Sequence, residues 1–412
     1  MKLIFKRFWW VILVVIFIIV VLFIIIDNSG SKKRNDDKNS NNLVFKNYAM
    51  STDLPKCPSD TSHIFTKPFM DGDYPDYIIP LGNSNSTSHT VPTDHVYPTN
   101  NTYKSEVPVY SPGTLTLIWV ENKRIYNSKT NEFMGSDYQL NFAPCRGINF
   151  GIIHLTGLSK RLIKAIDETD PKCSEGEYKF NQDDVVYYKT CHPDFDKITL
   201  KPGELIGTFG NMPHTLQMGF DIGIYDFNKP DLKFISKKRY YAETVHTACP
   251  FDYFIDELRN KYLSKMGGVE QQKDSRKFIK RNKEPLCGEI MYDVEGTISG
   301  DWFKNKIDKT STTNQEGAVA LVHDNLNPKL AKLSINSSTS ITFTPKHSGY
   351  INREFNEVTA DKNIYCYQYD GNGSQGAKIL IELIDDTHIK LEHKNGMCTN
   401  NEEFNEYTTY YR

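Results

Sequence analysis

The sequence lacks an excess of charge of either sign, since 49 Lys and Arg residues stand against 51 Asp and Glu residues in a chain of 412. Without a basic field, the chain lacks the electrostatic feature by which proteins hold nucleic-acid phosphates, so we expect no nucleic-acid partner. It also contains no Cys-x-x-Cys pair, which argues against a structural zinc site built from cysteines.

Charge, glycine and proline are all missing from residues 8–26, which form a run of 19 consecutive apolar residues. At about 1.5 Å per residue, a helix of this length spans roughly the 30 Å hydrocarbon core of a bilayer. The alternative is a cleaved signal peptide, but its apolar core usually covers only about 7 to 15 residues. We therefore predict an uncleaved single-pass transmembrane anchor over 8–26, with the lipid bilayer as its partner.

Cysteine is absent from the anchor and from everything before it, and all eight cysteines follow it. An even number of cysteines suits disulfides in an oxidising compartment, so we expect the bulk of the chain to be extracytoplasmic at the cell membrane. Basic residues flank both ends of the apolar run, so they do not decide its orientation. Four glycosylation sequons are compatible with an exterior location: Asn85, Asn100, Asn336 and Asn372.

Two cysteine pairs bracket short segments and are plausible local disulfides: Cys173 with Cys191, and Cys366 with Cys398. Spacing alone does not determine the connectivity, because eight cysteines allow about 105 pairings. We expect these bridges to act as structural staples and not in redox chemistry.

The rest of the chain divides by composition. Residues 27–56 are polar without apolar periodicity, which predicts a flexible stalk. Residues 57–249 contain short β-like runs separated by Gly, Pro and Asn, with one helical pattern over 155–168. Residues 250–286 predict a helical connector, and 287–412 return to strand patterns. We therefore expect a mainly β protein with few helices, whose C-terminal domain is a small β-barrel or β-sandwich.

One stretch combines the side chains that a catalytic zinc ion takes. His89 and Asp94, with His95 beside them, supply nitrogen and oxygen donors on a loop. A zinc-bound water loses a proton near neutral pH and becomes a nucleophile. His154 could steer such a water, although His and Asp side chains on loops are more often simply solvated or hydrogen-bonded.

The order of HTVPTD, VPVYSPG, FGIIHLTGLS, LKPGELIGTFGN and LQMGFDIGIYD resembles the lysostaphin-type, or LytM-like, zinc metallopeptidases over about 78–226. The resemblance implies a β-sandwich of the barrel-sandwich-hybrid kind. It places His89 and Asp94 as the opening metal ligands, His154 as a helper histidine, and 202–210 as a conserved type of turn. The whole chain also resembles uncharacterised membrane-anchored prokaryotic surface proteins.

The sequence departs from this family at the positions of the expected metal ligands. The expected His-x-His is absent, so the third ligand would be Asp221 or come from elsewhere, and one extra residue separates His89 from Asp94. These departures favour a peptidase-like module without cofactor or catalytic residues, which binds a cell-envelope polymer, a glycan or a protein. A zinc metallopeptidase that acts on cell-wall peptide cross-links is the alternative, with zinc on His89, Asp94 and Asp221. A purely structural envelope component is the third possibility.

Aromatic residues in the C-terminal part allow a further interpretation. Trp302, Tyr365, Tyr367 and Tyr369 could form a ligand platform, although packed architecture accounts equally for this spacing.

Overall fold

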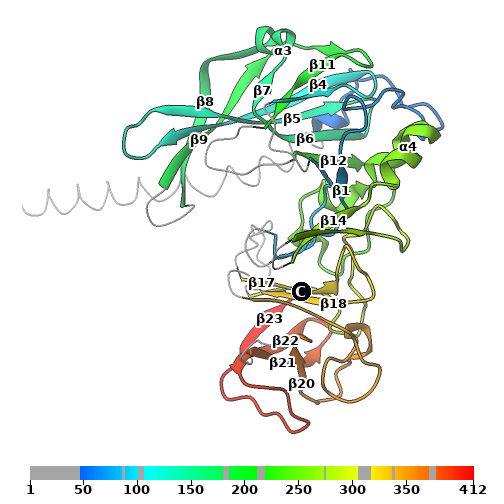
Figure 1. The fold of residues 1–412 in the computed structure, drawn as a ribbon, viewed down its shortest axis with the longest axis vertical. Helices are drawn as coiled ribbons and strands as arrows, with labels where there is room; N and C mark the ends of the chain where they lie inside the picture. The colour runs from blue at the N-terminus through cyan, green and yellow to red at the C-terminus, as the bar shows by residue number, and fades with distance from the viewer. Residues whose placement is uncertain are drawn as a thin grey trace, which may run out of the picture. The chain divides into compact units, whose positions relative to one another are not determined.

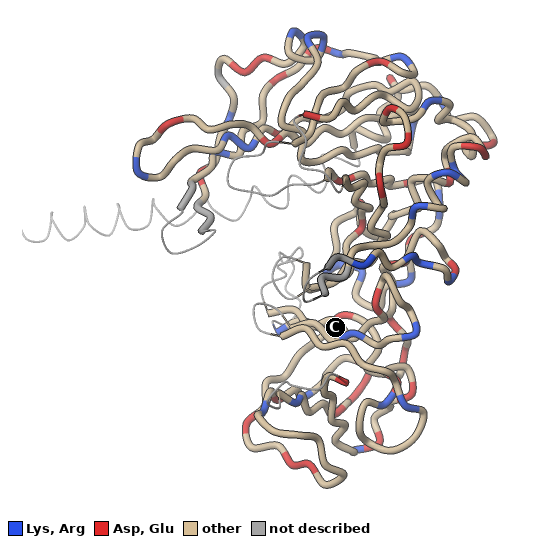
Figure 2. Tube along the Cα trace, in the orientation of Figure 1, with Lys and Arg blue, Asp and Glu red and all other residues tan. Residues whose placement is uncertain are grey.

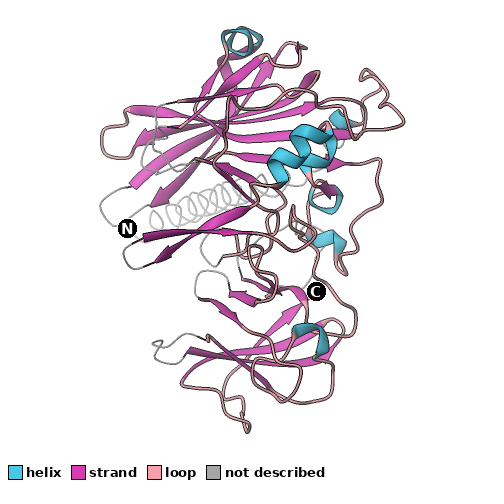
Figure 3. Cartoon of the chain, turned by 45° about the vertical axis from the view of Figure 1, so that its right-hand side comes forward, coloured by secondary structure: helices cyan, strands magenta, loops and turns pink. Residues whose placement is uncertain are grey.

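The computed structural model describes nine stretches of the chain: residues 47–85, 89–100, 106–179, 185–210, 219–272, 275–304, 317–335, 339–370 and 377–412. The predicted anchor over 8–26 and most of the predicted stalk over 27–56 lie outside these stretches. Within them, no helix is both long and apolar enough to cross a membrane. The expectation of a mainly β protein with few helices is confirmed (Figures 1 and 3).

The largest sheet of the first body, residues 47–286, has the strand order β13-β12-β6-β5-β4-β9-β8, with β10 paired to β4. The neighbouring strands of this sheet pair antiparallel. Its strands are β4 (Leu115–Asn127), β5 (Phe133–Ala143), β6 (Ile148–Leu155), β8 (Ile166–Lys179), β9 (Val185–Phe195), β10 (Thr199–Leu200), β12 (Asp221–Asp226) and β13 (Thr247–Ala248). Long β-branched and aromatic runs explain why this chain pairs as a sheet.

Smaller sheets complete the first body. A three-stranded sheet has the order β3-β11-β7, and two-stranded sheets pair β1 with β2 and β14 with β15. Their bounds are β1 (Tyr77–Ile79), β2 (Tyr97–Thr99), β3 (Val107–Tyr110), β7 (Gly157–Leu158), β11 (Leu205–Phe209), β14 (Gly267–Gln272) and β15 (Ser275–Lys280). Residues from the main sheet and from β3 and β11 share one hydrophobic core, which also takes Phe69, Phe251 and Tyr262 from the segments around it.

Within the described residues, helical structure is limited to short elements. Residues 47–49 are helical, the further α-helices are α3 (Lys160–Ala165) and α4 (Asp256–Leu263), and the 3-10 helices are η1 (Lys237–Arg239), η2 (Thr244–His246), η3 (Pro250–Tyr253) and η4 (Phe355–Glu357). Ser159 caps α3 by accepting a hydrogen bond from the backbone N–H of Leu162. The helix is shorter than the pattern over 155–168 predicts because β6 still holds Leu155 and β8 already begins at Ile166.

The predicted helical connector over 250–286 is helical only in its first part. After α4 the chain forms the hairpin β14–β15, which pairs Gly267 with Lys280 and Gln272 with Ser275. Gly267 and Gly268 end the helical pattern because glycine is a poor helix former. The alternation of side chains beyond them favours strands.

The C-terminal barrel is an eight-stranded sheet with the order β19-β18-β17-β16-β23-β22-β21-β20. Its strands are β16 (Gly300–Phe303), β17 (Ala318–His323), β18 (Ala331–Ile335), β19 (Thr339–Phe343), β20 (Tyr365–Gln368), β21 (Ala377–Asp385), β22 (His388–Asn395) and β23 (Thr408–Tyr411). The end strands β19 and β20 approach each other, so the sheet nearly closes. A separate apolar core fills it.

The aromatic residues of the barrel are mostly part of this core. Trp302 and Tyr367 are fully buried, and Tyr365 is only 6% exposed, whereas Tyr369 is 49% exposed. The indole N–H of Trp302 donates to the backbone carbonyl of Ile298. Packed architecture, and not a shared ligand platform, therefore accounts for these aromatic residues.

Four disulfides join all eight cysteines: Cys57–Cys145, Cys173–Cys191, Cys249–Cys287 and Cys366–Cys398. Two of these are the local pairs that the spacing marks as plausible. Four bridges in one chain indicate an extracytoplasmic protein. Of the four sequons, Asn85 lies in a bridge to His89, Asn100 is only 2% exposed, and Asn336 and Asn372 fall outside the described residues.

Acidic and basic residues are interspersed along both the first body and the C-terminal barrel (Figure 2). The balance of charge in the sequence is therefore also a balance along the folded chain.

Candidate functional site

Histidine and aspartate side chains from four separate segments meet at the start of β12. We call this group the His/Asp centre, and its members are His89, Asp94, His95, Asp137, His154 and Asp221. Asp221 opens β12, where its backbone pairs with Ile153 of β6, and this register brings the neighbouring His154 beside it. Asp137 lies on the next strand, β5.

The loop before β2 brings the remaining members to the same place. Val96 exchanges two backbone hydrogen bonds of 3.0 Å with Ile222, so the segment around it runs antiparallel to β12. This pairing positions the adjacent His95 close to Asp221. The ring of His89 lies 5.8 Å from that of His95, centroid to centroid.

Both well-placed imidazoles converge on one carboxylate oxygen. Nε2 of His95 lies 3.4 Å from Oδ2 of Asp221, and Nε2 of His154 lies 3.3 Å from the same oxygen. The opposite ring nitrogen of each histidine contacts a second carboxylate, at 3.0 Å to Asp94 and 3.1 Å to Asp137. Each imidazole is therefore held by one aspartate and directed at Asp221.

Asp94 has a second contact that fixes its orientation. The hydroxyl of Thr244, at the start of η2, donates a hydrogen bond of 2.6 Å to Oδ2 of Asp94. Asp94 thus links the His/Asp centre to the segment that leads into β13. In the sequence interpretation Asp94 is a metal ligand, whereas in the structure its carboxylate contacts the Nδ1 side of His95.

His154 has a backbone conformation that side chains rarely adopt, with φ at +72°. A non-glycine residue in this region costs of order 1–3 kcal/mol and persists only where the surroundings hold it. Its two aspartate contacts supply that restraint. The side chain is also 36% exposed, so it connects the buried part of the His/Asp centre to the surface.

Electrostatics divide the three histidines into two kinds. Burial lowers the pKa of His89 to about 4, with a further contribution from His95, so this imidazole is neutral at neutral pH. Burial also acts to lower the pKa of His154, but the charge of Asp221 and the hydrogen bond to Asp137 raise it to about 10. His95 shows the same balance, and Asp221 and Asp94 together raise its pKa.

The carboxylates respond in the opposite direction. Burial tends to raise the pKa of Asp221, but the positive charges of His154 and His95 hold it below its usual value. The hydrogen bond and charge of His95 do the same for Asp94. Without a metal, the His/Asp centre is thus a network of buried ion pairs with a neutral His89 at its side.

The donor set fits a divalent metal ion in its chemistry. Nε2 of His95 is buried without a hydrogen bond, and both histidines have the carboxylate contact on the far ring nitrogen that usually accompanies metal ligation. Ligands about 2.0–2.1 Å from a tetrahedral zinc ion lie about 3.3 Å from one another, close to the spacings around Asp221. Within the described residues, however, no three or more His, Cys, Asp and Glu side chains are already arranged as a metal-binding group. The histidines pair with the carboxylates instead.

Several predicted features near the His/Asp centre can be placed. The turn over 202–210 leads into β11, with positive φ values at Gly203 and Gly210. The resemblance expects a His-x-His near residues 216–221, and this sequence has none there. Of this segment, the structure describes only the part from Gly219 on, because residues 211–218 lie outside the described stretches. In the sequence, His95 stands out only as a neighbour of Asp94, and no pattern marks Asp137 or Thr244, because their contacts depend on strand register.

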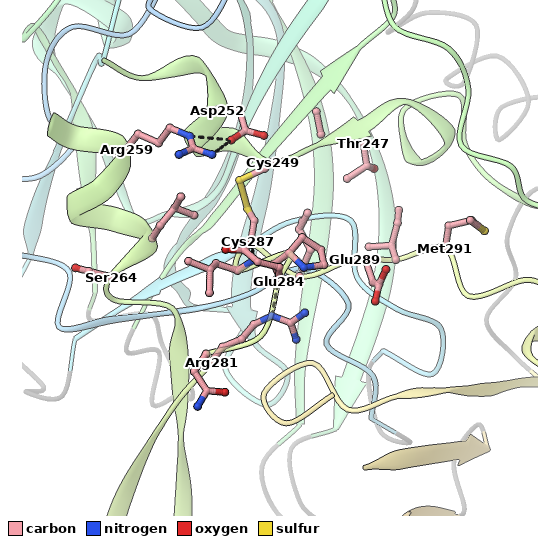
Figure 4. A pocket seen from close by; sticks show the side chains of 18 of the residues that line it. Thr247, Cys249, Asp252, Arg259, Ser264, Arg281, Glu284, Cys287, Glu289 and Met291 are labelled. Carbon is pink, nitrogen blue, oxygen red and sulfur yellow. Dashed lines mark hydrogen bonds and ion pairs between the residues drawn. A yellow bond between two sulfur atoms is a disulfide. The ribbon is translucent and has the colours of Figure 1, made fainter. Parts of the chain in front are cut away.

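A cavity of about 830 Å³ lies beside the Cys249–Cys287 disulfide, lined by the first body and by residues 287–291 that follow it (Figure 4). None of its lining residues belongs to the His/Asp centre.

Comparisons with protein-family models, with curated proteins and with solved structures found no match to this chain. The assignment of chemistry to the His/Asp centre accordingly rests on its geometry and on the sequence resemblance.

Proposed function

We propose that this chain is a membrane-tethered extracytoplasmic hydrolase whose His/Asp centre uses a divalent metal ion, most simply zinc, to cleave peptide cross-links of a cell envelope. The observation that carries the proposal is the convergence of His95 and His154 on one oxygen of Asp221, with each far ring nitrogen held by a carboxylate. The resemblance to lysostaphin-type peptidases supports peptide bonds as the substrate class and the barrel-sandwich kind of fold.

In this proposal the metal ligands are His95, His154 and Asp221. Asp221 would take the ligand position for which the sequence has no His-x-His, and His95 would take the position that the resemblance assigns to Asp94. Zinc held there would supply a water with a pKa of about 7 and a positive charge that polarises a carbonyl. Asp94 and Asp137 keep the two imidazoles in the orientation that presents Nε2.

His89 has a separate role. Its low pKa leaves the imidazole neutral at neutral pH, so it can accept or donate a hydrogen bond in the His/Asp centre without adding a charge. In the absence of metal, carboxylate partners raise the pKa values of both His95 and His154, and that of His154 reaches about 10, so this ring is protonated at neutral pH. Metal and protons therefore compete for these rings, and zinc affinity should rise steeply with pH.

The proposal is tested by metal analysis of the full chain, purified in detergent without chelators and dialysed against micromolar zinc. We expect about one zinc per chain, and its loss in Asp221→Asn and His95→Gln. A matched control is His63→Gln, which removes a histidine from an exposed His–Asp pair at 3.5 Å and should keep the zinc. Release of new amino termini from peptidoglycan should follow the same pattern among these variants.

A second function has its own support. The charges of the His/Asp centre already compensate one another as ion pairs, and this is the arrangement expected if the module binds an envelope polymer, glycan or protein without hydrolysing it. In that case the wild-type chain binds no stoichiometric zinc at any pH between 6 and 8, and Asp221→Asn leaves binding of the envelope polymer unchanged. The same zinc measurement thus separates the two functions.

A further inference from the structure

The cavity beside the Cys249–Cys287 disulfide has the size and composition of a small-molecule site. Its volume of about 830 Å³ falls within the range of roughly 300–1,000 Å³ typical of ligand pockets. Much of the lining is apolar, and we use three of these residues below: Leu263 at the end of α4, and Leu286 and Ile290 on the loop after β15. Figure 4 shows the disulfide joining the two sides of this space.

A buried arginine on the wall of the cavity has an incomplete set of partners. Arg281 follows β15 directly and is only 1% exposed. Its Nε donates to the carbonyl of Pro285 at 2.9 Å, and its Nη1 donates to the carbonyl of Asn325 at 2.7 Å. Its Nη2 is buried and makes no hydrogen bond.

The guanidinium also lacks a direct counter-ion. None of the ion pairs found among the described residues includes Arg281. Two backbone carbonyls and the more distant carboxylates of Glu284, Glu289 and Asp324 compensate its charge only in part, and a buried charge without a directly paired ion is costly. A negatively charged acceptor that enters the cavity could therefore pair with Arg281.

Charges around the cavity define which anion would fit. Arg259, Lys280 and Arg281 are balanced by Asp252, Glu284 and Glu289. Arg259 is already engaged by Asp252 at 3.1 Å. With no net positive charge, the cavity does not suit a polyanion such as a phosphate ester. One guanidinium beside an apolar wall suits a single carboxylate attached to an apolar body.

We propose that this cavity binds a molecule or chain end with one carboxylate on an apolar body. The carboxylate accepts the hydrogen bonds that Nη2 of Arg281 lacks, and the apolar body packs against Leu263, Leu286 and Ile290. Both a free apolar acid and the carboxyl end of a peptide have this chemistry. The site is independent of the His/Asp centre, because the two share no residue.

Calorimetric titration of the full chain tests this inference with two acids and their amides. The probes are octanoate against octanamide, and N-acetyl-Leu-Leu against N-acetyl-Leu-Leu-amide. We expect at least one acid to bind. The affinity of its amide should be lower by about tenfold or more, because the amide loses a charged hydrogen bond. Preference for octanoate identifies a free acid as the ligand type, and preference for the dipeptide identifies a chain end.

Two variants locate the binding. Arg281→Lys keeps the charge but removes the fork, and should weaken the acid about tenfold. Since Arg281 also holds two backbone carbonyls, Met291→Trp provides a second variant that fills the cavity from its lining and should abolish binding. Met397→Trp is the control, because Met397 is 60% exposed and outside the cavity.

Three results would overturn the inference: no binding of either acid at millimolar concentration, equal binding of acid and amide, or full binding by Met291→Trp. None of these results affects the zinc measurement on the His/Asp centre, so failure of this inference is distinguishable from failure of the proposed hydrolase.

Discussion

The first body and the C-terminal barrel use their buried volume differently. The barrel encloses an apolar core, in which Trp302, Tyr367 and Phe355 are fully buried. Charged residues are buried in the same part of the chain, among them Asp301, Glu354 and Arg412. The first body has a larger apolar core, and it gathers its buried Asp94 and Asp221 around histidines whose pKa values these carboxylates raise. A buried ion-pair network is weak evidence for stability, whereas an apolar core is strong evidence. The first body thus differs from the barrel in bringing three histidines and three aspartates together at one place.

The largest expected effect is the loss of a barrel core side chain. Trp302→Ala should lower the free energy of unfolding by about 3–5 kcal/mol, because a fully buried indole leaves a cavity and an unpaired carbonyl at Ile298. Urea denaturation followed by circular dichroism measures this change. Tyr407→Ala is the control, since Tyr407 is 51% exposed and its loss should change stability by less than about 0.5 kcal/mol. Equal effects of the two substitutions would remove the contrast with the first body.

Breaking the His/Asp centre should lower the free energy of unfolding slightly less, and a second substitution should restore part of the loss. Asp221→Leu leaves the imidazoles of His95 and His154 without their shared carboxylate, and should destabilise the metal-free protein by about 3 kcal/mol. Adding His95→Phe removes one of these imidazoles but leaves Asp94 without its histidine partner, although Thr244 still donates to it, so it should recover only part of that loss while zinc binding stays absent. A double variant as unstable as the single one would show that the centre contributes stability of its own.

The pH dependence of the first body should reveal a third, intermediate effect at Glu243, next to η2. Burial raises the pKa of its carboxyl to about 7, with the charge of Asp94 acting in the same direction. The unfolded chain releases this proton near pH 4.5, so the contribution to stability is complete below that pH and is lost as the pH rises towards 7.

We therefore expect the wild type to lose about 2–3 kcal/mol more than Glu243→Gln between pH 4.5 and 7.5. Unfolding by urea across this pH range measures the difference between the two proteins. Parallel pH profiles would contradict the assignment of this effect to Glu243.

The smallest expected effect compares two disulfides. Cys57–Cys145 closes a loop with a sequence separation of 88 in the first body, and Cys366–Cys398 closes one of 32 in the barrel. Chain entropy predicts that removing the first with serines costs about 1 kcal/mol more than removing the second. Thermal unfolding of the two double-serine variants measures this difference, and a larger loss from the barrel would show that local packing outweighs loop length.

Sequence patterns predict the class of this fold better than the site within it. Short alternating runs separated by turn residues predict the β structure, and the spacing of Cys173 and Cys191 marks one of the bridges that form. The helical spacing around Tyr262 predicts α4. The predicted helical segment extends past the end of α4, because two glycines and the β14–β15 hairpin follow the helix. Such local patterns carry little information on which strands become neighbours.

The candidate site shows this limit in single residues. Asp137 lies within β5 and has no motif of its own, and only the pairing of β5 with β6 brings it to His154. His95 stands next to Asp94 in sequence, but its role depends on the two hydrogen bonds between Val96 and Ile222. Trp302 is conspicuous in sequence, and the barrel simply buries it.

The left-handed backbone of His154 sets apart what folding prefers from what the chemistry needs. Glycine and asparagine adopt that conformation at lower cost than an imidazole-bearing residue. A library randomised at this position and sorted only for surface display should therefore become enriched in those two residues. Under the proposed function, the same library sorted for zinc retention should return histidine. The difference in residue frequencies between the two selections would measure the stability lost by placing an imidazole at this backbone conformation.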